Sequence, residues 1–163
     1  MKIEEIIGNY VEFLDGIFDS LNQFGVHNDE LKELDHIAYR TQDIQKYDDV
    51  KEKLMPFFDE YSEKEFGGRL IFVGRFEKPL KYMQFSVSGF ELLAPKNNNT
   101  FGDGLEHAEF ILKESLSNFY KEHEDIKFNL NAYDRDENPE LIIDFEDCAA
   151  KFHEVSLLDV RKI

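Results

Sequence analysis

The sequence runs through one order of segments twice, and a histidine stands near the start of each copy. Residues 35–39 read DHIAY and residues 106–110 read EHAEF, so both run acidic, histidine, apolar, small or acidic, aromatic. Each is followed by an amphipathic helical pattern and then by three strand-like runs, which is a βαβββ order. Equivalent strands of two such modules can face each other across one cleft. The repeat therefore predicts that His36 and His107 converge on a single site.

The apolar pattern divides the chain into an extension and two modules. Apolar residues at three- and four-residue steps between Ile3 and Leu21 predict a packed helix, and Asn28 can cap a short helical turn. We therefore expect an α+β fold in one compact domain, with two βαβββ modules forming curved mixed sheets around one cleft. The expected parts are an N-terminal helical extension at 1–34, the first module at 35–95, an Asn- and Gly-rich linker at 96–105, and the second module with a C-terminal tail at 106–163.

Strand, helix and turn signals set the elements that we expect inside each module. The first module should contain strands at 35–41, 69–76, 80–88 and 90–94, a helix after Thr41 or Asp43, and a turn at 78–79. The second module should contain strands at 107–112, 126–132, 141–145 and 151–157, and a helix at 113–122. The first strand of each module thus carries the histidine.

The charge of the chain argues against several classes of partner. Its 35 acidic and 19 basic residues give a formal net charge of −16, which repels phosphate backbones and anionic membrane surfaces, so we expect no nucleic-acid or membrane partner. No segment approaches the roughly 20 apolar residues that span a bilayer. The N-terminal residues lack the pattern of a secretion signal, and Cys148 is the only cysteine. These features predict a cytoplasmic protein with a small-molecule ligand or substrate.

Strand alternation indicates which polar side chains share a surface. In the first strand His36 and Arg40 point to one face, and in its counterpart His107 and Glu109 point to one face, while the apolar residues suit the helices. In the run FELL at 90–93, Phe90 and Leu92 face the helices. Glu91 between them therefore points to the same face as His36. Two histidines and a carboxylate are therefore expected on the concave face.

The last strand offers two candidates for the same face. If Phe152 matches Phe90, then His153 takes the position of Glu91; if the register slips by one residue, Glu154 takes it instead. We prefer His153, with Glu154 as the alternative ligand.

These side chains have the chemistry of a divalent-metal site. Neutral imidazoles suit Zn, Fe, Mn or Ni, and carboxylates add hard oxygen ligands. Glu109 has four possible roles: a ligand, a group that orients a ligand histidine, a base for a substrate proton or bound water, or an ion-pair partner of Arg40. Arg40 can hold a substrate carboxylate or phosphate, or it can form an ordinary ion pair. The spacing alone is not specific, because the sequence has no HxH or HxxxH cluster.

At these residues the chain resembles the YecM family, a branch of the vicinal oxygen chelate superfamily that includes glyoxalase I, extradiol dioxygenases and bleomycin-resistance proteins. The resemblance covers about residues 10–157 and lies in the order of five segments: DHIAYR at 35–40, GGRLIFV at 67–73, FELLAPK at 90–96, GLEHAEFIL at 104–112 and KFHEVSL at 151–157. It implies metal ligands on the first and last strands of each module, which fall on His36, Glu91, His107 and His153. A glyoxalase-like site would have Glu at the fourth position, so the resemblance implies the fold and the site more firmly than a glyoxalase reaction.

Two hypotheses about function follow. In the first, the chain is a divalent-metal enzyme of the vicinal oxygen chelate type, a lyase, isomerase or oxygenase acting on a small oxygenated molecule, with Glu109 as the catalytic base. In the second, it is a metal-free binding or sequestration protein, similar to the bleomycin-resistance branch.

Overall fold

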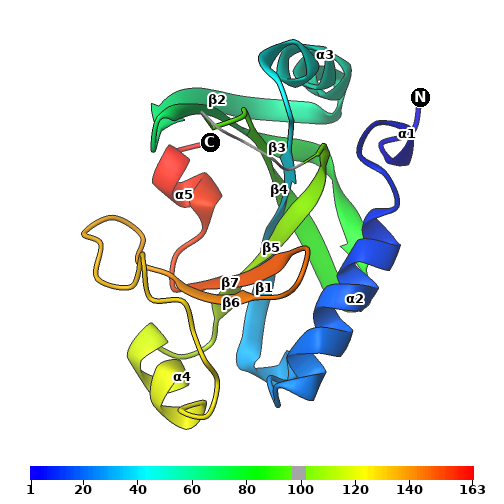
Figure 1. Cartoon of the computed structure of the whole chain (residues 1–163). Coiled ribbons are helices and arrows are strands. Elements are labelled where there is room, and N and C mark those ends of the chain that lie inside the picture. Colours follow the sequence, from blue (N-terminus) through cyan, green and yellow to red (C-terminus); the bar gives the residue numbers. More distant parts are fainter. Residues whose placement is uncertain (97–101) are drawn as a thin grey trace.

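The computed structural model describes residues 1–96 and 102–163, and the strands of this part form one mixed seven-stranded sheet with the order β2-β3-β4-β1-β5-β7-β6 (Figure 1). The strands are β1 (Leu31–Arg40), β2 (Phe58–Phe66), β3 (Arg69–Tyr82), β4 (Phe85–Leu93), β5 (Gly104–Leu112), β6 (Leu141–Asp144) and β7 (Ala149–His153). The α-helices are α1 (Glu4–Ile7), α2 (Tyr10–Gln23), α3 (Ile44–Leu54), α4 (Leu116–Glu122) and α5 (Leu157–Arg161), and the 3-10 turns are η1 (Asn28–Glu30) and η2 (Met55–Phe57). The predicted α+β fold with N-terminal helices is confirmed.

Two runs of elements meet at the centre of the sheet. β1, α3, β2, β3 and β4 follow one another along the chain, and β1 pairs with β4 in parallel. β5, α4, β6 and β7 come next, and β5 pairs with β7 in parallel. Antiparallel pairing of β1 with β5 joins the two runs. The four strands β4, β1, β5 and β7, on which the candidate ligands were expected, are therefore neighbours.

The N-terminal segment forms two helices rather than one. Gly8 has φ +86, a conformation that interrupts a helix, and Asn9 then caps α2 by accepting a hydrogen bond from the Glu12 backbone N–H. The apolar side of α2 packs on the sheet, where Phe18 contacts Phe110 with their ring centroids 5.5 Å apart. This helix therefore covers one face of the sheet (Figure 1).

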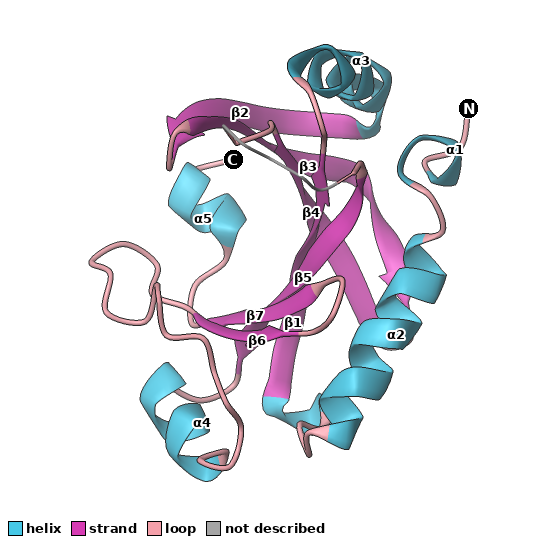
Figure 2. Ribbon diagram, in the orientation of Figure 1, coloured by secondary structure: helices cyan, strands magenta, loops and turns pink. Residues whose placement is uncertain are grey.

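The two faces of the sheet have different side chains. The face under α2 and α3 holds the main apolar core, in which Phe90, Phe110 and Phe152 are fully buried. On the other face Leu158 of α5 packs in a smaller apolar cluster with Ala38, Ile71, Val73 and Leu93. Figure 2 shows the sheet curving around α5 on this side. The alternation expected from the sequence thus leaves the polar residues of the central strands on the α5 side.

Strand boundaries in the first run differ from the predicted ones. β2 was not predicted, because it is an edge strand whose side chains are mostly exposed and show no apolar alternation. β3 and β4 form one long hairpin that turns at Met83 and Gln84, in place of the predicted strands at 69–76, 80–88 and 90–94. The predicted turn at 78–79 lies inside β3, where a register shift between Arg75 and Leu80 accommodates Pro79.

The second run also differs from its prediction. Residues 126–132 do not form a strand; only Asn129 makes an isolated bridge, with Ile142. The Asn129 side chain accepts a hydrogen bond from the Asn131 backbone N–H at 3.0 Å, and this local turn ends the pairing. The predicted strand at 151–157 ends at His153, because Ser156 caps α5 by accepting a hydrogen bond from the Leu158 backbone N–H.

The predicted linker lies between the two described parts of the chain. Residues 97–101 of the predicted 96–105 linker lie outside the described residues, and β5 begins at Gly104. Among the described helices, none is long and apolar enough to cross a membrane.

Candidate metal centre

Five ionisable side chains gather on the α5 side of the sheet. His36 comes from β1, Glu91 from β4, His107 and Glu109 from β5, and His153 from β7. All five are buried, and His36 has no exposed surface. Strand pairing places them together, since β1 lies between β4 and β5 and His36 is opposite Glu109 in the register. These five residues are called the His–Glu cluster below.

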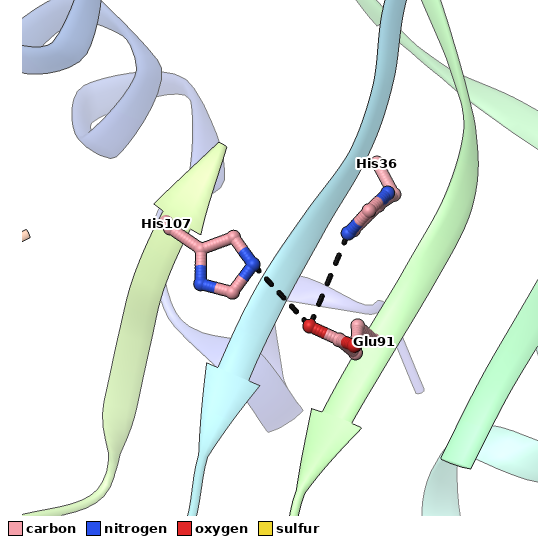
Figure 3. Close-up of side chains that lie close together, drawn as sticks. All are labelled: His36, Glu91 and His107. Carbon is pink, nitrogen blue, oxygen red and sulfur yellow. Dashed lines mark ion pairs between the residues drawn. The ribbon is translucent and has the colours of Figure 1, made fainter. Parts of the chain in front are cut away.

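His36, Glu91 and His107 form the first part of the cluster (Figure 3). The Nε2 atom of His107 lies 3.2 Å from Glu91 Oε2, and the Nε2 atom of His36 lies 3.9 Å from the same oxygen. Both nitrogens are buried, and neither makes a hydrogen bond of acceptable geometry within the described part of the chain. Two buried imidazole nitrogens and one carboxylate oxygen thus point at a common position.

Acidic neighbours hold the two imidazole rings from behind. His36 Nδ1 donates to Asp35 Oδ2 at 2.8 Å, and His107 Nδ1 lies 3.3 Å from Glu106 Oε1. Each contact directs the Nε2 lone pair toward the cluster, as carboxylates do behind metal-ligating histidines. Gly89 makes room for His36, because a Cβ added at Gly89 would lie 2.8 Å from the His36 Cβ.

Glu109 links this part of the cluster to His153. Its Oε2 lies 3.3 Å from His36 Nε2 and 3.9 Å from His107 Nε2, while its Oε1 lies 2.9 Å from His153 Nε2. One carboxylate therefore contacts all three histidines. This position is compatible with three of the four roles that the sequence left open: a ligand, an orienting group and a base.

A sixth ionisable residue, Glu140, lies beside the cluster and contacts His153. Its Oε2 lies 3.0 Å from His153 Nε2, and Arg135 and Lys151 approach its carboxylate at 3.2 and 3.9 Å. Glu140, Glu109 and His153 form a second group with the donor atoms to hold a metal ion. Sequence reasoning missed Glu140 because it precedes β6 in an irregular segment, where no alternation indicates the direction of a side chain.

The carboxylates raise the basicity of two histidines. Burial alone lowers the pKa of His36, but the charge of Glu109, the hydrogen bond to Asp35 and the charges of Asp35 and Glu91 raise it from 6.5 to about 9. Burial also lowers the pKa of His153, and its contacts with Glu109 and Glu140 raise it to about 9. Without a metal, both imidazoles are therefore protonated at neutral pH.

The histidines have the reciprocal effect on the carboxylates. Burial raises the pKa of Glu91, but the close contact with His107 and the charges of His107 and His36 lower it to about 2. Burial raises the pKa of Glu109 as well, and the charges of His36 and His153 hold it well below its usual value. Both carboxylates are ionised at neutral pH, which is the state that a metal ligand requires. The lowered pKa makes Glu109 a weak base as long as His36 and His153 carry their charges.

The residues present fit a first-row divalent metal. The donors are imidazole nitrogens and carboxylate oxygens, the Nε2 atoms of two histidines converge, and acidic neighbours hold the two rings through Nδ1. The Nε2 atoms of His36 and His107 lie within ion-pair distance of Glu109 and Glu91 but make no well-formed hydrogen bond, and a cation between the two nitrogens would satisfy them. The buried His and Glu groups can therefore hold a metal.

The two remaining candidates from the sequence lie in other contacts. Arg40 donates from Nε to the Gly102 carbonyl at 3.1 Å and lies 3.8 Å from Glu106. Glu154, the alternative ligand, accepts a hydrogen bond from the Leu116 backbone N–H at 2.7 Å, at the first residue of α4. The structure brings neither into the His–Glu cluster.

A cavity of about 430 Å³ opens above the cluster. Glu91, Glu109 and Glu140 form part of its wall, and Leu157, Val160 and Arg161 of α5 form another part. Its volume is in the range of small-molecule sites. A ligand in this cavity would contact the cluster directly.

Two solved structures have a fold similar to that of this chain. The structure described as "Structural Genomics, Protein EC4020" aligns with a TM-score of 0.75 and 19% identity over 98% of this chain and 94% of that chain. A methylmalonyl-CoA epimerase from Streptomyces coelicolor aligns with a TM-score of 0.52 and 13% identity over 76% of this chain and 96% of its own. At these identities the likeness shows the fold alone, which this chain shares with both proteins.

The family follows from the sequence match. The family model described as "YecM protein" matches residues 2–162, and the chain therefore belongs to the YecM family, as the resemblance of its segments indicated. No curated protein matches the sequence.

Proposed function

We propose that this protein is a metal-dependent enzyme of the vicinal oxygen chelate type that acts on a small oxygenated molecule in the cavity. One observation carries the proposal: the buried Nε2 atoms of His36 and His107, which make no well-formed hydrogen bond in the described part of the chain, converge with Glu91 at the edge of a cavity of ligand size. Closed structural sites use four protein ligands, whereas catalytic sites keep a position open for water or substrate. Three protein donors beside a cavity match the second pattern.

The proposed ligands are His36, Glu91 and His107. His153, expected from the sequence as a fourth ligand, contacts Glu109 and Glu140. We therefore assign His153 to the positioning of Glu109, and it becomes a direct ligand only if Glu109 moves aside. Nitrogen and carboxylate donors suit Zn, Fe, Mn or Ni.

The chemistry divides between the metal and Glu109. A metal held here would act as a Lewis acid on a substrate oxygen. Glu109 is ionised and part of the cavity wall, so it would accept a proton from the substrate carbon or from water. Contact of its Oε1 with His153 leaves Oε2 on the side of His36 and His107, which directs the basic oxygen to the proposed metal position. This division makes Glu109 the catalytic base.

A metal-free binding protein is the second candidate function. It is favoured by the charge pairing in the cluster, because protonated His36 and His153 balance Glu109 and Glu91 without any metal. In that case the cavity would hold a ligand without making or breaking a bond.

We also propose that the two runs of elements are related modules, 35–95 and 106–163. Parallel pairing of β1 with β4 and of β5 with β7 supports this, as does the position of His36 and His107 on the first strand of each run. The missing strand at 126–132 is the main difference between them. Superposition of the β1–β4 and β5–β7 pairs tests the relation, and a lack of correspondence between the two histidines would contradict it.

Metal titration separates the two candidate functions. The protein, purified without a histidine tag or chelator, is titrated with Zn²⁺, Mn²⁺, Fe²⁺ and Ni²⁺ by calorimetry and then measured for bound metal. We expect one tightly bound ion per chain and at least about a hundredfold weaker binding in His36→Ala and His107→Ala. His27→Ala is the matched control, because His27 is exposed and outside the cluster. Unchanged binding in both cluster variants would refute the ligand assignment.

A further inference from the structure

The cavity above the His–Glu cluster has a basic wall in an acidic protein. Six of its 18 lining residues are Lys or Arg, whereas the whole chain has 19 such residues among 163 and a net charge of −16. Basic residues are thus concentrated at the place where a substrate would enter. Such a concentration attracts ligands of opposite charge.

Lys151 carries a positive charge next to the cluster. It lies on β7, two residues before His153, and its Nζ is 3.9 Å from Glu140 Oε1. The ordinary pKa of a lysine ammonium group is about 10.4. Lys151 therefore presents an ammonium group to the cavity at neutral pH.

Two guanidinium groups face the same cavity from other elements. Arg69 begins β3 and Arg161 ends α5, and both are half-buried. Within residues 1–96 and 102–163, neither guanidinium makes a salt bridge or a side-chain hydrogen bond; Arg69 acts on Glu106 only through its charge. A half-buried guanidinium with five donors and no acceptor is an unused binding group.

The acidic residues of the wall do not cancel these charges. Glu91, Glu109 and Glu140 are already paired with the histidines of the cluster. Glu65 and Glu137 are exposed and in contact with solvent. Among the half-buried and buried lining residues that the structure describes, the charged groups without an ion pair are therefore the guanidinium groups of Arg69 and Arg161.

We propose that the cavity binds a small anion, a molecule whose carboxylate or phosphate group is held by Arg69, Lys151 and Arg161 beside Glu91 and Glu109. This inference rests on the proposed function, because it names the charge of the molecule that the metal-dependent site takes. Planar guanidinium groups bind carboxylate and phosphate oxygens in pairs, and an ammonium group adds a point charge. A cavity of about 430 Å³ limits the ligand to a small molecule.

An NMR titration of the full chain tests this inference. Backbone amide shifts are followed while malonate or inorganic phosphate is added at constant ionic strength, with malonamide as the uncharged match for malonate. The titration is done on the metal-free protein and on protein loaded with Zn²⁺. We expect malonate or phosphate, and not malonamide, to shift the amides of Arg69, Lys151 and Arg161. Comparison of the two anions identifies the group that the cavity prefers.

Two arginine variants test whether these side chains bind the anion. Arg69→Gln and Arg161→Gln should each weaken the binding of the preferred anion about tenfold, because each removes a charge-assisted contact. Lys32→Gln is the matched control, since Lys32 is exposed on β1 and does not line the cavity. The amide spectrum of each variant also reports whether it is folded.

The outcomes separate this inference from the proposed function. Anion binding that fails in both the metal-free and the Zn²⁺-loaded protein, or that is unchanged in both arginine variants, overturns the inference while the metal titration stands. Anion binding without any metal binding supports the inference and refutes the metal-dependent function.

Discussion

Stability of the metal-free protein should fall as the pH rises from about 6 to about 9.5. The folded state raises the pKa of His36 from 6.5 to about 9, chiefly because the charge of Glu109 outweighs the effect of burial. A histidine whose pKa is raised by folding contributes its full stabilisation below pH 6.5. This contribution is lost as the pH rises through about 9. His153 shows the same shift and shares Glu109 with His36, so the two contributions are coupled rather than additive.

The size of the effect follows from the shift. Moving the pKa from 6.5 to about 9 corresponds to about 3 kcal/mol for His36 alone. For a chain of 163 residues this loss lowers the melting temperature by about 10 °C. The measurement is urea denaturation followed by circular dichroism, in the presence of EDTA, at several pH values across this range.

Two variants and one metal experiment sharpen the test. Glu109→Gln removes the charge that raises both histidines and should flatten the profile, whereas His27→Gln, outside the cluster, should leave it unchanged. Affinity for Zn²⁺ should change in the opposite direction and rise with pH, because ligand histidines must lose their protons. A free energy of unfolding that stays constant or rises between about pH 6 and 9.5 would refute the charge pairing that we describe.

Three further predictions concern single side chains. Once a substrate is found, Glu109→Gln should keep metal affinity and lose turnover; loss of the metal instead would make Glu109 a ligand, and full activity would make it structural. Gly89→Ala should weaken metal binding at least about tenfold and cost about 1–3 kcal/mol of stability, because the new Cβ would lie 2.8 Å from the His36 Cβ; calorimetry and urea denaturation measure the two effects, and normal metal affinity would contradict the packing argument. Glu154→Ala should cost about 1 kcal/mol through the lost hydrogen bond to the Leu116 N–H and leave metal affinity unchanged, whereas weaker metal binding would restore Glu154 as a ligand.

Several features of the site could be predicted from local sequence. Alternation in a strand has a period of two, so Phe90 and Leu92 in the core require Glu91 on the opposite face, and Phe110 in the core requires Glu109 on that face. The same rule correctly separates His153 from the core residue Phe152. These predictions needed only neighbouring residues, because side-chain direction in a strand is a local property.

Contacts between distant segments could not be predicted in this way. Asp35 holds His36 and also accepts a hydrogen bond from the Leu157 backbone N–H at 3.1 Å, which joins β1 to the start of α5. Arg40 shares the face predicted for it, yet the loop before β5 supplies its hydrogen-bond partner at Gly102. Both contacts depend on how loops close, and loop closure depends on the whole fold rather than on local pattern.

The sequence by itself determined the α+β class, the face on which each strand residue lies, and the imidazole and carboxylate chemistry of that face, because these depend on residue type and on a period of two. Only the tertiary structure decided that Glu109 contacts three histidines, that Glu140 joins them and that Glu154 is directed to α4. Those contacts require the antiparallel register of β1 with β5, which places Glu109 opposite His36, and the path of the segment before β6. Register and loop path are set by packing over the whole sheet, so no local stretch of sequence contains them.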